Sequence, residues 1–181
     1  SSKDEIKVYR YRKPGKRGIM PIEAELRLHR CCFTGHRPEK LRKSERDIRS
    51  ELEKQIKQAV ADGFTTFITG MARGTDIIAG EIVLQLRTEK FPVRLICASP
   101  YPGFEEGWSN AWQKRYRNII ETADLVRYIS AGYSRSCFQI RNEWMVNHSS
   151  RVIAVFNGQK SGTKNTVDYA KRKGIKVVNV L

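Results

Sequence analysis

The chain has 181 residues, of which 40% are hydrophobic, and it carries a formal net charge of +15 at pH 7. This length suits a single domain with a core of its own, and the hydrophobic content excludes a wholly disordered chain. No apolar run approaches the roughly 20 residues that a membrane-spanning helix needs, and no secretory signal pattern opens the sequence. These features predict a cytoplasmic protein with no membrane partner.

The excess of positive charge favours a polyanionic partner, although solubility alone would also account for it. Nine of the 34 Lys and Arg residues and four of the 19 Asp and Glu residues lie in residues 1–30, so the rest of the chain is basic too. We expect residues 1–25 to form a basic N-terminal extension and residues 26–181 to form the folded domain. The Tyr and Arg residues that alternate over 9–12 suit nucleic-acid contact, but a solvated tail is favoured.

The four cysteines are Cys31, Cys32, Cys97 and Cys137. They form no C-x-x-C pair and no Cys/His pair at zinc spacing, so we expect buried thiols and neither a metal site nor a disulfide framework. Cys31 and Cys32 are neighbours in a predicted strand, which places their side chains on opposite faces of the sheet.

Strands and helices are predicted to alternate in chain order from residue 28 onward. The first strand covers residues 28–34, and apolar residues at helical spacing follow from Ile48 to Val60, with Ser44 as the N-cap. Later strands are expected at 65–69, 92–98, 125–129, 152–156 and 176–180, and later helices at 75–87, 108–121, 138–147 and 163–172. This alternation implies right-handed crossovers. The predicted fold class is α/β, a single Rossmann-like three-layer αβα sandwich with a mostly parallel sheet.

A glycine-containing turn follows three of the predicted strands. The three segments are Phe33–Pro38, Phe67–Asp76 and Phe156–Thr163. The turns after parallel strands lie at the same edge of the sheet, so they can converge on one crevice. Unpaired N–H groups and the helix dipole favour an anion at a helix start, and a nucleotide phosphate is the expected occupant.

Two common phosphate-binding motifs are absent from the sequence. No G-x-G-x-x-G follows the first strand, and Gly158–Thr163 does not fit G-x-x-x-x-G-K-[ST]. An NAD-dependent dehydrogenase and a P-loop NTPase are therefore disfavoured.

Four motifs, in this order, resemble the SLOG superfamily. They are Phe33–Pro38, Gly70–Asp76, Arg141–Val146 and Ser161–Thr166. The likeness covers about residues 28–181 and is strongest to the YpsA-like branch, which is common in Gram-positive bacteria and their mobile elements. The superfamily comprises Rossmann-like nucleotide binders that commonly dimerise, among them the single-stranded-DNA-binding protein DprA, the Lonely Guy phosphoribohydrolases and nucleotide-signal sensors. The resemblance implies a nucleotide-like ligand, a bacterial or phage origin and a homo-oligomer.

The first turn offers the Thr34 hydroxyl, the Gly35 N–H and the Arg37 cation for phosphate or ribose. Alternatively, Pro38 merely sets the backbone of a helix-capping turn. His36 is open to three interpretations: stacking on a base, contact with phosphate, or exposure to solvent.

In the second turn, Gly70 and Gly74 allow close backbone approach to a ligand, and Thr75 opens the following helix. Arg73 has the planar fork that pairs with phosphate. Asp76 could accept a hydrogen bond from a ribose hydroxyl or cap its helix. Glu81, further along this helix, is a weaker candidate acid.

The remaining candidate ligand-binding residues are Arg141, Asn142, Ser161, Gly162 and Thr163. Arg141 could reach a phosphate, Asn142 could contact a base edge or ribose, and the turn at 161–163 could hold a phosphate. Trp108, Trp112 and Tyr116 fall at helical spacing. A core or dimer-interface stripe is the favoured interpretation, and a base-stacking wall is the alternative.

Thr166 departs from the pattern of the related phosphoribohydrolases. Those enzymes carry Pro-Gly-Gly-x-Gly-Thr-x-x-Glu, and Thr166 stands where their catalytic Glu would be. A hydroxyl cannot act as that carboxylate does, so we expect nucleotide binding or sensing without catalysis. The alternatives are a nucleotide N-glycosidase that uses Glu81 or Asp76, and a DprA-like single-stranded-DNA binder. Beyond a nucleotide-like ligand, no cofactor or metal is implied.

Overall fold

A computed structural model describes residues 22–181, and most of the predicted N-terminal extension lies outside this range. Within residues 22–181, six strands form one sheet in the order β4-β3-β2-β1-β5-β6, and every neighbouring pair is parallel. The strands are β1 (Arg30–Gly35), β2 (Thr66–Thr69), β3 (Arg94–Ser99), β4 (Leu125–Tyr128), β5 (Arg151–Val155) and β6 (Lys176–Asn179). The predicted α/β fold class is confirmed, with a sheet that is parallel throughout.

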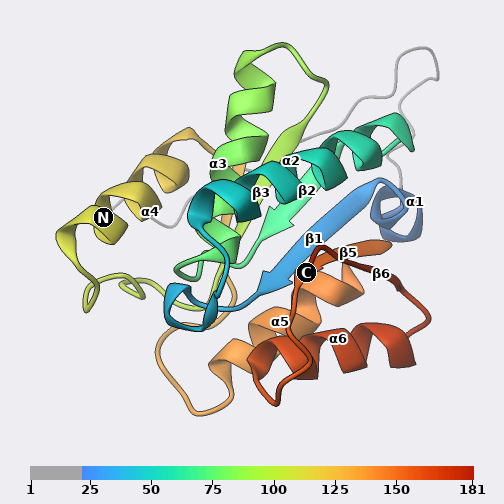
Figure 1. Cartoon of the computed structure of the whole chain (residues 1–181). Coiled ribbons are helices and arrows are strands. Elements are labelled where there is room, and N and C mark those ends of the chain that lie inside the picture. Colours follow the sequence, from blue (N-terminus) through green and yellow to red (C-terminus); the bar gives the residue numbers. More distant parts are fainter. Residues whose placement is uncertain (1–21) are drawn as a thin grey trace.

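Helices cover both faces of this sheet (Figure 1). Their bounds are α1 (Glu23–Arg27), the 3-10 helix η1 (Pro38–Lys40), α2 (Glu45–Ala61), α3 (Thr75–Thr88), α4 (Asn110–Thr122), α5 (Cys137–Asn147) and α6 (Gly162–Arg172). One hydrophobic cluster joins α2, α3 and α4 to one face, and a second joins α5 and α6 to the other. Cys31 belongs to the first cluster and Cys32 to the second, as their alternation in the strand predicts.

Local sequence explains where these elements begin and why they are buried. The Ser44 hydroxyl accepts a hydrogen bond from the Asp47 N–H at 3.1 Å, which confirms the predicted N-cap of α2. The central strands β1, β2 and β5 are buried along almost their whole length because helices cover both of their faces. All four cysteines are buried and free, as predicted.

The order in which strands are added to the sheet reverses between β1 and β5. Strands β2 to β4 are added on one side of β1, whereas β5 and β6 lie on the other. Ligands of open α/β sheets bind at the carboxyl ends of the strands near such a reversal. Figure 1 shows η1 at the carboxyl end of β1, so the turns that follow the strands are gathered at this edge.

Helix α1 was not predicted and spans the expected boundary at residue 25. The segment is tied to the domain, because Arg27 Nη1 donates to the Ser149 carbonyl at 3.2 Å and Glu23 forms an ion pair with Arg30. Within residues 22–181, no helix is both long and apolar enough to cross a bilayer.

Candidate functional site

The turns after β1 and β2 interlock. Thr75 Oγ1 donates a hydrogen bond to the His36 carbonyl at 3.2 Å. A Cβ at Gly35 would lie 2.3 Å from Thr75 Oγ1, and a Cβ at Gly74 would lie 2.8 Å from the His36 carbonyl oxygen. Gly74 also has a φ of +87°, which favours glycine. The two glycines are therefore required for packing between the turns, and the Thr75 hydroxyl is used within the protein.

His36 joins the turn after β1 to the turn after β5. Its side chain is only 3% exposed, and its Nε2 accepts a hydrogen bond from the Asn157 N–H at 3.1 Å. Burial lowers the His36 pKa, and the Asn157 bond needs an unprotonated Nε2, so the ring is neutral with its proton on Nδ1. Its ring centroid lies 5.9 Å from that of Phe156. The solvent-exposed interpretation of His36 is therefore wrong.

The third turn is largely occupied with starting α6. Ser161 Oγ accepts from the Lys164 N–H at 3.1 Å and donates to the Gln159 carbonyl at 3.1 Å, so this hydroxyl is the N-cap. Thr166 Oγ1 donates to the Gly162 carbonyl at 3.0 Å, and Thr163 is buried. This turn is connected to the first one through the bond between Asn157 and His36.

The side chains of Arg141 and Asp76 both lie close to Gly70, the residue that follows β2. Arg141 is 5% exposed; its Nη1 donates to the Gly70 carbonyl and its Nε donates to Asn142 Oδ1 at 2.7 Å. A Cβ at Gly70 would lie 2.9 Å from Asp76 Oδ2 and 3.1 Å from the Arg141 guanidinium carbon. Glycine at position 70 therefore leaves room for these two charged side chains beside the backbone.

Asp76 is a buried acid with an unused acceptor atom. Its Oδ2 accepts from the Ala72 N–H at 3.2 Å, whereas Oδ1 is buried without a partner among the described residues. Ala72 precedes α3, so the carboxylate holds the turn rather than capping the helix. Burial raises the Asp76 pKa to about 6, against the opposing charges of Arg141 and Arg37. Oδ1 could accept a hydrogen bond from a ligand hydroxyl if the ligand reached it.

A cavity of about 390 Å³ opens beside the first two turns. Arg37 and Arg73 contribute its cations, and four aromatic side chains contribute much of the remaining lining: Tyr101, Phe104, Trp108 and Phe138. The Phe104 and Trp108 rings pack edge to face, with their centroids 5.0 Å apart. Arg37 is exposed, and Arg73 forms an ion pair with Glu39 at 2.7 Å. The cavity thus combines guanidinium groups with apolar ring surfaces.

Tyr101, Phe104 and Phe138 were missed as site residues from the sequence. The available signal was their position, because Tyr101 and Phe104 follow β3 and Phe138 lies in the first turn of α5, which places all three at the carboxyl edge. Trp108 lies before α4, which begins at Asn110, so it is not part of that helix. Its ring nevertheless packs edge to face against Tyr116, with centroids 5.5 Å apart, and Trp108 and Trp112 both pack against the core, as the favoured interpretation predicts. Tyr116 is in the core, with its hydroxyl 2.8 Å from Ser99 Oγ.

Glu81 is not brought together with the cavity residues. Its carboxylate accepts from Arg49 Nη2 at 2.9 Å and from Arg115 Nη2 at 2.6 Å. This network connects α3 with α2 and α4 and extends to Glu45, which lies 2.8 Å from Arg115 Nη1. The contacts of Glu81 are those of a structural ion pair between helices.

The family of the chain is decided by its sequence match. The model of the YspA SLOG family, YpsA, matches residues 31–177. The chain belongs to the YspA SLOG family. The uncharacterized SPbeta prophage-derived protein YoqJ of Bacillus subtilis (strain 168) is 37% identical over 118 residues, or 59% of this chain and 69% of YoqJ. A UPF0398 protein of Bacillus thuringiensis (strain Al Hakam) is 28% identical over 130 residues, 70% of this chain and 71% of that protein.

The SLOG fold of the chain is also similar to a solved structure of DNA processing protein A from Helicobacter pylori. The TM-score is 0.61 at 19% sequence identity, over 87% of this chain and 66% of that one. That structure concerns the single-stranded DNA binding mode of the Helicobacter protein. At this level of identity the likeness confirms the fold. The predicted membership in the YpsA-like SLOG branch is confirmed by the family match.

Proposed function

We propose that this SLOG protein binds a nucleotide or nucleotide-derived ligand at the carboxyl edge of its sheet. The proposal rests on the cavity of about 390 Å³ that combines Arg37 and Arg73 with an aromatic wall. Guanidinium groups pair with phosphate oxygens through a planar fork, and aromatic rings offer faces on which bases stack. The cavity volume falls within the roughly 300–1,000 Å³ of small-molecule sites. The phosphate would bind the arginines, and the base would lie against Phe104 and Trp108.

The chemistry at the site favours binding or sensing over hydrolysis. The Thr166 hydroxyl is already bonded to the Gly162 carbonyl, at the start of its own helix. Glu81 is held by two arginines away from the cavity lining. Of the two candidate acids for an N-glycosidase, Asp76 is the one with an unused acceptor atom. Chromatography of nucleoside monophosphates incubated with the protein tests this alternative, because base release that disappears in Asp76→Asn would favour the enzyme.

A titration of charge-matched variants tests the binding site. Calorimetry with a panel of nucleoside monophosphates should find at least one ligand, and Arg37→Gln and Arg73→Gln should each weaken it about 10- to 100-fold, as expected when a charge-assisted hydrogen bond is lost. Arg172→Gln is the control, because Arg172 lies in the last turn of α6, at the opposite edge of the sheet. This variant has the same net charge as Arg37→Gln and Arg73→Gln. Equal affinity for all three variants would contradict this site.

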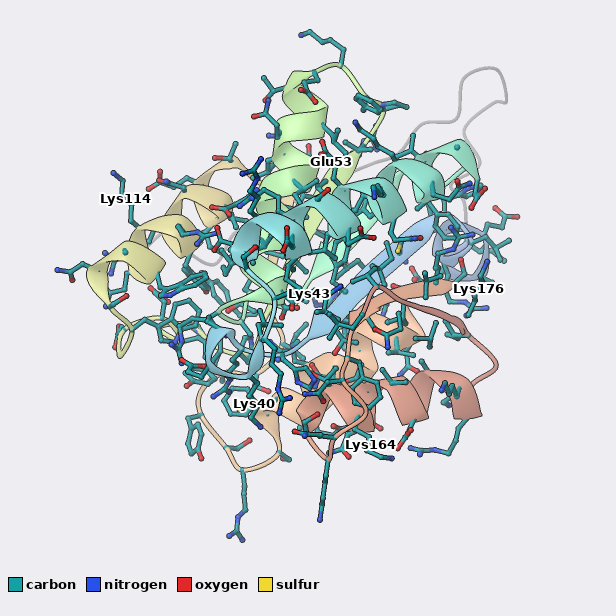
Figure 2. The ribbon with its side chains drawn as sticks, viewed as in Figure 1. Lys40, Lys43, Glu53, Lys114, Lys164 and Lys176 are labelled. Carbon is teal, nitrogen blue, oxygen red and sulfur yellow. The ribbon has the colours of Figure 1, made fainter. Side chains whose placement is uncertain are left out.

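Single-stranded DNA is a second candidate ligand, favoured by the likeness to the Helicobacter protein and by the net charge of +15. Figure 2 shows Lys40 and Lys43 on the segment around η1, beside the edge where β1 ends. Such a surface would bind an oligonucleotide with an affinity whose logarithm falls linearly with the logarithm of salt concentration. Fluorescence anisotropy with labelled oligothymidine and a duplex of equal length checks this, and salt-independent or absent binding would exclude it.

A further inference from the structure

Glu39 forms an ion pair with Arg73, one of the two cationic side chains that line the cavity. Its Oε1 lies 2.7 Å from Arg73 Nη1, and its side chain is 58% exposed whereas that of Arg73 is 27% exposed. Arg73 lines the cavity, but Glu39 does not. One of the groups expected to hold phosphate therefore already has an anionic partner supplied by the chain.

The local fold fixes this carboxylate next to the site. Glu39 is the central residue of η1, and Pro38 in the same turn packs near Gly74, where a Cβ would lie 3.0 Å from Pro38 Cδ. The turn therefore carries Glu39 against the segment that holds Arg73.

Glu39 is ionised at neutral pH. A hydrogen bond from its own backbone N–H, the bond from Arg73 and the charges of Arg73 and Arg37 all lower its pKa. The side chain is exposed, so it can leave Arg73 without disturbing buried groups. An exposed ion pair of this kind is weak and can be displaced by a stronger anion.

We propose that Glu39 competes with the ligand for Arg73 and thereby selects ligands that carry a terminal phosphate. This inference rests on the proposed function of the cavity. A phosphate monoester has a charge of about −1.5 to −2 at neutral pH and three acceptor oxygens, as a phosphoserine does. An internal phosphodiester carries a single negative charge and competes less well with a carboxylate. Glu39 is on this account a specificity-determining residue, and terminal phosphate could come from a mononucleotide or from the end of a strand.

Binding of three probes separates these sources. The probes are 5′-AMP, oligothymidine with a 5′-phosphate and the same oligothymidine without it. Wild type should prefer the phosphorylated oligonucleotide. Glu39→Gln should tighten binding of the unphosphorylated strand about two- to fivefold, the range that an exposed ion pair allows, and should narrow the preference. If 5′-AMP is the only probe that binds, the terminal phosphate belongs to a mononucleotide. Glu39→Gln should then increase the affinity for 5′-AMP.

Glu53→Gln is the matched control, because it changes the net charge equally but lies on α2, away from η1 (Figure 2). The Glu53 side chain is 44% exposed and lies 3.6 Å from Lys57 Nζ, so both variants remove an ion pair at the surface. It should leave the affinities within experimental error. In an Arg73→Gln background, Glu39→Gln should have no effect, because the competition takes place at Arg73.

A direct readout is the titration of Glu39 followed by NMR. A bound ligand that displaces the carboxylate should raise its pKa toward the ordinary glutamate value, and this does not depend on any variant folding. Three results would each overturn the proposed competition between Glu39 and the ligand. Glu39→Gln could leave the affinities unchanged, as Glu53→Gln should; Glu39→Gln could still tighten binding in the Arg73→Gln background; or the Glu39 titration could be the same in the free protein and in the complex. Those results would leave the proposed nucleotide site standing. Failure of wild type to bind any of these probes or any nucleotide of the monophosphate panel would overturn both proposals.

Discussion

Gly35 illustrates how little space separates the two interlocked turns. A Cβ there would lie 2.3 to 2.5 Å from three atoms of the Thr75 side chain, so Gly35→Ala forces one turn to move. We expect it to lower the free energy of unfolding by about 1–3 kcal/mol, as overpacking does. Gly162→Ala is the control, because nothing lies within 4 Å of its added Cβ. Urea unfolding checks both variants, and equal stability of the two would contradict the close approach.

The buried acid Asp76 should make stability depend on pH. Burial raises its pKa from 3.8 to about 6, so the folded state binds the proton more tightly than the unfolded chain does. The stability that protonation contributes is present below pH 4 and is lost as pH rises through about 6. A shift of about two units corresponds to about 3 kcal/mol.

Asp76→Asn removes this titration. Wild type should therefore lose about 3 kcal/mol relative to Asp76→Asn between about pH 4 and pH 7. Denaturant unfolding across that range measures the difference. A difference that stays constant with pH would show that Asp76 titrates normally in the folded state.

Individual site residues were predictable to different degrees. Arg37 and Arg73 stand in glycine turns directly after strands, and the local pattern was enough to place them at the carboxyl edge. The burial of His36 was not predictable, because it depends on the Asn157 N–H from a turn 121 residues further along the chain. Of the aromatic wall, only Trp108 was considered from the sequence. Tyr101 and Phe104 lie in the segment between β3 and α4, which has no regular periodicity, and Phe138 comes from α5, so no local pattern shows that these rings meet.

At the scale of elements, the N-cap of α2 gives a clean prediction. Ser44→Ala removes the acceptor for the Asp47 N–H and should lower the free energy of unfolding by about 1 kcal/mol. Ser109→Ala at the start of α4 should cost less, because its bond to the Trp112 N–H is longer, at 3.5 Å. Urea unfolding of the two variants compares them, and a larger effect at Ser109 would contradict the ranking.

The contacts between helices also decide the role of Glu81. Glu81→Gln breaks ion pairs with Arg49 and Arg115 and should lower stability by about 1 kcal/mol or more, since these side chains are partly buried. Nucleotide affinity should remain that of wild type. Calorimetry and thermal unfolding on the same samples test this, and lost affinity at unchanged stability would restore Glu81 as a site residue.

Most elements were predicted from sequence, because apolar periodicity and capping residues are local signals. Ser44 marked the start of α2, and the alternation of strands with helices was sufficient for the parallel sheet. Helix α1 was missed because five residues carry too little periodicity, and its link to the Ser149 carbonyl is made 122 residues away. Trp108 was placed in a helix because its spacing from Trp112 fits one, whereas Ser109 caps the helix after it.

For the whole molecule, ligand binding should appear as stabilisation. A ligand at 100 times its dissociation constant adds about 2.7 kcal/mol if it binds only the folded state. For a domain of this size that raises the melting temperature by about 5–10 °C. Scanning calorimetry with the best nucleotide checks the shift. Arg37→Gln should lose most of it, and a full shift in that variant would place the ligand elsewhere.

The interlocked turns also limit how this protein can be recombined with its relatives. The segment after β1 and the segment after β2 share the contacts among Gly35, Gly74, Thr75 and the His36 carbonyl. Either segment taken alone from a relative with a bulkier residue at position 35 or 74 would collide with its unchanged counterpart. Chimeras should therefore exchange the two segments as one cassette, and ligand preference should travel with that cassette.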